Sequence, residues 1–155
     1  MKRGSGGREQ PFEDGARGVV GPAAREAFDR VWTGAATDAD FDASAPFFYG
    51  RWDAGAQEHA ASEAGQTNEE AAAGYAAPGA FDLDAARVAL AGRDVPVLVL
   101  AGELDGGPLP RVATGIAELF PAGEPAVQLG AGHFPWLDDP CRFARTVEAF
   151  LARSR

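Results

Sequence analysis

The sequence is poor in cysteine, in positive charge and in long apolar runs. Its single cysteine, Cys141, leaves no partner for an internal disulfide and no cysteine cluster for zinc. Lys and Arg number 14 against 23 Asp and Glu, a net charge of −9, which argues against a protein that binds the nucleic-acid backbone. No apolar run approaches the roughly 20 residues of a membrane span, and the basic N-terminus lacks the apolar core of a signal peptide. We therefore expect a cytoplasmic protein that binds neither nucleic acid nor membrane.

The 155 residues suffice for one ordinary domain, and 46% apolar residues are typical of a globular chain. The pattern changes twice along the sequence. Residues 1–21 are Gly-rich and aperiodic and are predicted to form a flexible lead-in. Residues 22–80 show helical periodicity, whereas residues 81–155 alternate between helical and strand patterns. The second change predicts an α/β fold preceded by a helical region.

Local signals mark the ends of several helices in the first region. Pro22 and Gly34 bound a predicted helix over residues 22–33, and Asp53 can cap a second helix that runs to residue 64. Thr67 and Glu70 have the spacing of a capping box for a third helix. His59, between acidic neighbours in the second helix, is interpreted as a solvated surface histidine rather than a metal ligand.

The second region carries the predicted sheet. The expected elements are a helix over residues 82–90, a strand over 95–101, a helix over 111–120, a strand over 126–129 and a final helix capped by Asp139. The strand over 95–101 is apolar on both faces, which predicts a central strand of a parallel sheet with helices on each side. The final helix is expected to bury Phe143, Val147, Phe150 and Leu151. Asp138 and Asp139 are assigned to the start of that helix, where acidic residues are favourable.

Two loops carry the candidate chemistry, because each directly follows a strand. Asp105 lies in the first loop and His133 in the second, and the carboxyl ends of parallel strands are where active sites of α/β sheets lie. An Asp that accepts the imidazole Nδ1–H leaves the other nitrogen free to act as a general base. Glu103 is the alternative acid, and Asp105 as a simple turn residue is the alternative without function.

The two loops together resemble the C-terminal part of α/β-hydrolase-fold enzymes. The resemblance is carried by strand-Gly102-Glu-Leu-Asp105 and by Gly132-His133 followed by Pro140 before the last helix. It implies that Asp105 is the acid and His133 the base of a catalytic triad, and that residues 22–80 are similar to the family's lid. The implied substrate is a small molecule with an ester, amide or similar bond, as in proline iminopeptidase-like hydrolases. No cofactor and no metal is implied.

Aromatic residues near these loops have two interpretations. The resemblance makes Tyr49, Trp52 and Phe134 candidates for substrate binding. Alternatively, Tyr49 and Trp52 belong to an aromatic segment that packs the lid onto the core, and Phe134 packs the histidine loop with Trp136 against the last helix.

The family's Gly-x-Ser-x-Gly nucleophile motif does not occur in this sequence. Ser5 comes closest, but Arg3 replaces the first glycine and no strand precedes it; Cys141 belongs to the last helix. Three interpretations follow: a hydrolase or a C-terminal piece of one, a non-catalytic binding remnant, or a truncated product. Two strands form a weak sheet, so we expect marginal stability and a partner, either a complementary N-terminal fragment or a second copy joined through exposed strand edges.

Overall fold

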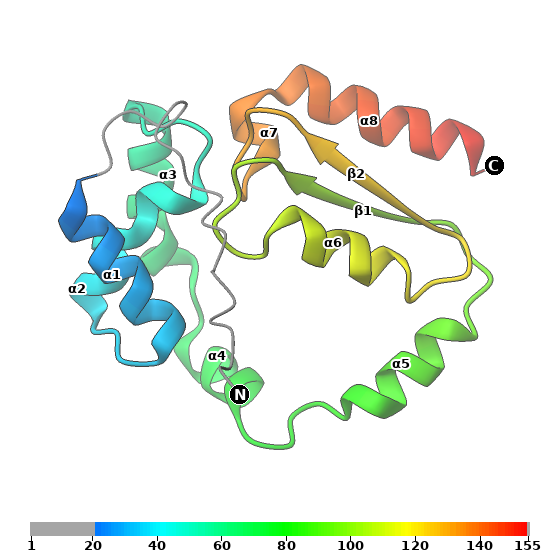
Figure 1. Ribbon diagram of the computed structural model, residues 1–155, viewed down its shortest axis with the longest axis horizontal. Helices are drawn as coiled ribbons and strands as arrows, with labels where there is room; N and C mark the ends of the chain where they lie inside the picture. Colours follow the sequence, from blue (N-terminus) through cyan, green and yellow to red (C-terminus); the bar gives the residue numbers. More distant parts are fainter. Residues whose placement is uncertain (1–20, 155) are drawn as a thin grey trace, which may run out of the picture.

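The computed structural model describes residues 21–154, and the predictions for the lead-in and for Ser5 lie almost entirely outside them. The described chain is a mixed α/β structure with a small parallel sheet (Figure 1). Its elements are α1 (Pro22–Thr33), α2 (Asp38–Ser44), the 3-10 helix η1 (Ala45–Phe48), α3 (Ala54–Gln66), α4 (Glu69–Ala76), α5 (Leu83–Ala91), β1 (Val97–Gly102), α6 (Pro110–Ala117), β2 (Gly123–Gln128), α7 (Pro135–Asp138) and α8 (Pro140–Arg153).

Most of the predicted helix ends are confirmed. Gly34 ends α1 with a φ of 73°, a left-handed conformation that glycine adopts without a steric penalty. The carboxylates of Asp53, Asp82 and Asp139 accept hydrogen bonds from the first-turn amides of α3, α5 and α8. Each of these caps satisfies donors that have no partner within the helix.

The third predicted helix start is wrong by one residue. Asn68 caps α4 by accepting from the Ala71 amide, whereas the Thr67 hydroxyl donates backward to the Glu63 carbonyl at the end of α3. The capping box lies instead at α2, which we did not predict. There Thr37 is paired with Asp40, a shorter side chain at the position that Glu or Gln usually takes.

The two strands are parallel, as predicted, and run in register from the Val97–Gly123 pair to the Gly102–Gln128 pair. β1 begins after Pro96, later than expected. β2 begins three residues earlier than predicted and ends before Leu129. α6 is shorter than predicted, and the short helix α7 occupies part of the expected histidine loop.

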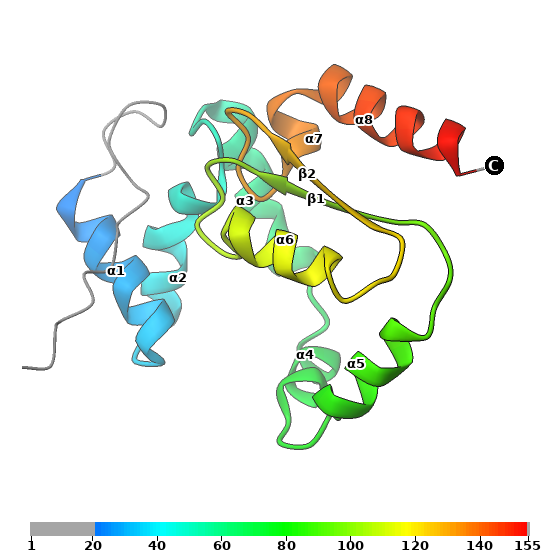
Figure 2. The same cartoon turned by 45° about the vertical axis from the view of Figure 1, so that its right-hand side comes forward.

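β1 has a helix on each side, as predicted, but it is not a central strand in the described part of the chain. Among the described residues the sheet has two strands, so β1 pairs along one edge, and its first four residues are only half-buried. α6 packs on one face, and α8 lies over the other (Figures 1 and 2). An open groove of about 700 Å³, lined by Leu98 and Ala126 of the strands and by Arg142 and Arg145 of α8, separates α8 from the sheet.

The helices differ in how well they are packed. Phe28 of α1 stacks on Phe47 of η1 at 4.5 Å between ring centroids, and both rings are buried. In contrast, no residue of α5 is buried, and Leu83 and Val88 are 66% and 76% exposed. On α8, Phe150 is buried as predicted, Phe143 and Val147 are half-buried, and Leu151 is 52% exposed. No described helix has the length and apolarity needed to cross a bilayer.

Candidate functional site

The two loops predicted to carry chemistry meet at one edge of the sheet. β1 and β2 are parallel and in register, so the loops that follow Gly102 and Gln128 leave the sheet side by side. His133 Nδ1 lies 2.8 Å from Asp105 Oδ2. The sequence-based expectation that these side chains meet is therefore confirmed.

Asp105 is held in place by its own loop. The residue is 4% exposed, and its other carboxylate oxygen, Oδ1, accepts a hydrogen bond of 2.8 Å from the Gly107 amide. The turn role that the sequence offered as an alternative is thus present together with the contact to His133. A carboxylate fixed at both oxygens holds the imidazole in one orientation.

His133 has one nitrogen engaged and one available. Its side chain is 40% exposed, and Nε2 has no hydrogen-bond partner within residues 21–154. The hydrogen bond to Asp105 raises the pKa of His133 above its ordinary value, and partial burial opposes this rise. An imidazole that donates Nδ1–H to a carboxylate can accept a proton at Nε2, as a general base does.

Glu103, the alternative acid, has a different contact. Its carboxylate accepts a hydrogen bond of 2.9 Å from the Gly130 amide, so it joins the two loops near the strand ends without contacting His133. The geometry therefore favours Asp105 over Glu103 as the partner of the histidine.

A segment of the helical region contacts both loops, and we call residues 47–51 the bridging segment. Its Phe47 carbonyl accepts from the Gly106 amide at 3.1 Å, next to Asp105, and its Phe48 carbonyl accepts from the His133 amide at 2.7 Å. The backbones approach so closely that a Cβ on Gly132 would lie 2.6 Å from the Phe48 carbonyl oxygen. Only glycine fits at that position.

The candidate substrate residues form an aromatic cluster beside the pair. Tyr49 is 3% exposed and lies 5.1 Å from Trp52 and 4.9 Å from Phe134 between ring centroids. Its hydroxyl lies 2.8 Å from His59 Nδ1, and burial raises the pKa of Tyr49 to about 12. The packing interpretation accounts for Tyr49, and the substrate-binding roles of the three aromatic residues stay predictions.

This cluster also corrects the interpretation of His59. The residue is half-buried against Phe134, at 4.6 Å between ring centroids, rather than solvated. Phe134 packs mainly on this cluster, whereas Trp136 contacts Phe143 of the last helix at 5.9 Å, as expected. The contact between His59 and Tyr49 was not predicted from the sequence because Tyr49 lies outside the helix that carries His59.

Asp138 is the residue near the site that sequence reasoning missed. Instead of starting the last helix, it ends α7, and its carboxylate accepts from the amides of Gly50 and Gly132. The sequence identifies Asp139, directly before Pro140, as the helix cap, but it carries no signal that the Asp138 carboxylate reaches the amides of Gly50 and Gly132.

No nucleophile for His133 is found in the described part of the chain. The hydroxyls of Ser44, Ser62 and Ser154 each donate to a backbone carbonyl within three or four residues. Cys141 is exposed on α8. In the same part of the chain, no three His, Cys, Asp or Glu side chains are grouped so that they could hold a metal ion.

Comparison with known proteins does not assign this arrangement to a family. No protein-family model, no curated protein and no solved structure matches the chain.

Proposed function

We propose that the chain provides the acid and base of a serine-type α/β-hydrolase site, with Asp105 as the acid and His133 as the base. The proposal is supported chiefly by the 2.8 Å contact between His133 Nδ1 and Asp105 Oδ2, at the carboxyl ends of two parallel strands. The substrate is a small molecule with an ester, amide or similar bond. The helical region acts as the lid over this site.

The proposed chemistry follows from the two ring nitrogens. Nδ1–H donates to Asp105, so Nε2 carries the lone pair and takes the proton of an attacking hydroxyl as the new C–O bond forms. The imidazolium that results is stabilised by the buried carboxylate, and it then gives the same proton to the leaving group as that bond breaks.

The nucleophile in this proposal comes from a complementary segment that adds to the sheet. Each described strand is paired along one edge only, and an unpaired strand edge is a template for another strand. Large apolar side chains also lie uncovered on α5 and α6, among them Val88, Val112 and Ile116. A segment that paired with β1 and covered part of this surface would bury both features.

Complementation tests the proposal. The DNA upstream of the Met1 codon is translated in three frames, and a polypeptide with a strand followed by Gly-x-Ser-x-Gly is co-expressed with this chain. We expect a fluorophosphonate probe to label that serine and His133→Ala to lower turnover on an activated ester about 10⁴-fold or more. Glu148→Ala is the control, because Glu148 is exposed on α8 and lies outside both loops and the aromatic cluster.

Three results would overturn this proposal. One is a loss of less than tenfold for His133→Ala in an active complex. Another is a probe that labels Ser5 in the chain alone, since the nucleophile would then lie within this sequence. The last is an upstream sequence without the motif.

A second candidate is a non-catalytic binding protein that uses the same two loops. The observation that favours it is the lack of a serine or cysteine bonded to His133 within the described residues. A well-folded chain that stays unlabelled by the probe, with no motif upstream, would support this candidate or the truncated-product interpretation.

A further inference from the structure

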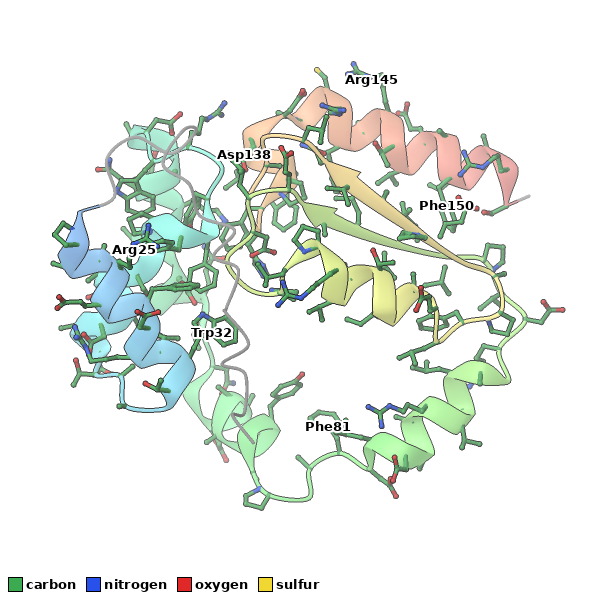
Figure 3. All side chains as sticks on the ribbon, viewed as in Figure 1. Arg25, Trp32, Phe81, Asp138, Arg145 and Phe150 are labelled. Carbon is green, nitrogen blue, oxygen red and sulfur yellow. The ribbon has the colours of Figure 1, made fainter. Side chains whose placement is uncertain are left out.

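Asp138 joins the helical region to the histidine loop at the junction seen in Figure 3. Its Oδ2 accepts hydrogen bonds from the Gly132 amide at 2.8 Å and from the Gly50 amide at 3.2 Å. Gly132 immediately precedes His133, and Gly50 belongs to the bridging segment. One carboxylate oxygen therefore holds together two parts of the chain that are 82 positions apart in the sequence.

The same junction is held from the opposite side. Arg51, the last residue of the bridging segment, donates from Nη2 to the Leu137 carbonyl at 2.8 Å and from Nη1 to the Asp138 carbonyl at 3.1 Å. In these contacts the bridging segment supplies the donors, and Leu137 and Asp138 supply the acceptors. Hydrogen bonds that involve an ionised group are about twice as strong as neutral ones.

The junction leaves little room for movement. A Cβ on Gly50 would lie 2.9 Å from the Asp138 carboxylate, and one on Gly132 would lie 2.5 Å from the Tyr49 carbonyl carbon. Next to these contacts, the Phe48 carbonyl accepts from the His133 amide at 2.7 Å. A shift of the bridging segment would therefore move the backbone of His133 itself.

We propose that Asp138 is a positioning residue that locks the bridging segment onto the histidine loop and thereby keeps the His133 imidazole on Asp105. A role of this lock in catalysis rests on the proposed function, whereas its role in holding His133 against Asp105 does not. The lock makes the state of the pair depend on the docking of the helical region. Separation of the bridging segment would free the histidine loop and release His133 from Asp105.

The test uses nuclear magnetic resonance of the ¹⁵N-labelled chain. It measures the Nδ1–H resonance of His133, the pKa of His133 by titration and the exchange of the Gly50 and Gly132 amides. Asp138→Ala is expected to remove the Nδ1–H resonance, to lower the pKa of His133 toward its ordinary value and to speed exchange of both amides. Signals of α6 report that the sheet stays folded.

Asp139→Ala is the matched control. It removes an adjacent carboxylate that caps α8 through the Arg142 amide and has no contact with the bridging segment. It should lower stability while leaving the His133 signals unchanged. Asp138→Asn retains an acceptor oxygen and is expected to restore the Nδ1–H resonance. If Asp138→Ala does not fold, Arg51→Ala weakens the same junction from the other side and should produce the same loss.

The proposal is overturned if the folded Asp138→Ala or Arg51→Ala chain keeps the resonance and pKa of the wild type. It is also overturned if Asp139→Ala disturbs His133 equally, or if Asp138→Asn gives no rescue. None of these measurements requires hydrolysis. A failed complementation assay with an intact lock would therefore count against the proposed function alone.

Discussion

Gly132→Ala should destabilise the protein, whereas the same change at an open helical position should not. The added methyl group would lie 2.5–2.6 Å from backbone atoms of Phe48, Tyr49 and Gly50, none of which is a flexible side-chain end. Overpacking of this kind costs about 1–3 kcal/mol. Displacement of the segment also weakens the 2.7 Å bond between the His133 amide and the Phe48 carbonyl, at about 0.5–1.5 kcal/mol. We therefore expect a loss of about 2–4 kcal/mol in the free energy of unfolding.

Gly115→Ala is the matched control for this prediction. Gly115 is exposed within α6, and nothing lies within 4 Å of the position that its Cβ would take. Alanine is the better helix former there, so this variant should gain about 0.5–1 kcal/mol.

The assay is urea unfolding followed by far-ultraviolet circular dichroism, with equal m-values showing that the same surface is exposed. If Gly132→Ala proves unfolded in buffer, it is measured in the Gly115→Ala background. A change of less than about 0.5 kcal/mol, typical of an ordinary surface position, would refute a tight junction between the bridging segment and the histidine loop.

Three further predictions concern stability. The pKa of His133 is raised in the folded chain, so the stabilisation from its contact with Asp105 should be complete below about pH 6.5 and lost as pH rises through the folded pKa. The free energies of unfolding of wild type and His133→Ala should therefore differ more at low pH than at high pH. An equal difference at both would contradict the pairing. Arg30 and Thr37 hold the pKa of Asp40 well below its usual value, so wild type should lose stability in acid as that carboxylate protonates. Asp40→Asn should be less stable than wild type at neutral pH and less sensitive to acid. Thermal unfolding across a pH series measures both effects. The isolated chain should be marginally stable because, over residues 21–154, the sheet has two strands and α5 buries no residue. Cooperative melting of a monomer above about 50 °C in calorimetry would contradict this.

Local chemistry accounts for the elements that the sequence predicted well. A cap joins a side chain to amides two or three residues away, so Asp53, Asp82 and Asp139 mark helix starts without any knowledge of the fold. The extent to which other segments bury β1 could not be predicted in this way. An apolar run shows that a strand can be buried on both faces, but the burial itself depends on which other segments reach it.

The candidate site was predictable in outline for a related reason. Asp105 and His133 each follow a strand, and parallel strands in register end at the same edge, so the contact between them follows from the order of elements. The sequence alone therefore determined the residue types, the capped helices, the parallel strands and the Asp–His contact.

Only the tertiary structure decided how that contact is held. In the folded chain Asp138, and not Asp139, accepts hydrogen bonds from the amides of Gly50 and Gly132, and His59 lies within hydrogen-bond distance of Tyr49. These contacts join segments whose separation in space depends on the whole chain, and no local pattern encodes that separation. Two neighbouring aspartates with the same helix-start chemistry acquire different roles because the fold directs one carboxylate to the bridging segment and the other to the amides of α8.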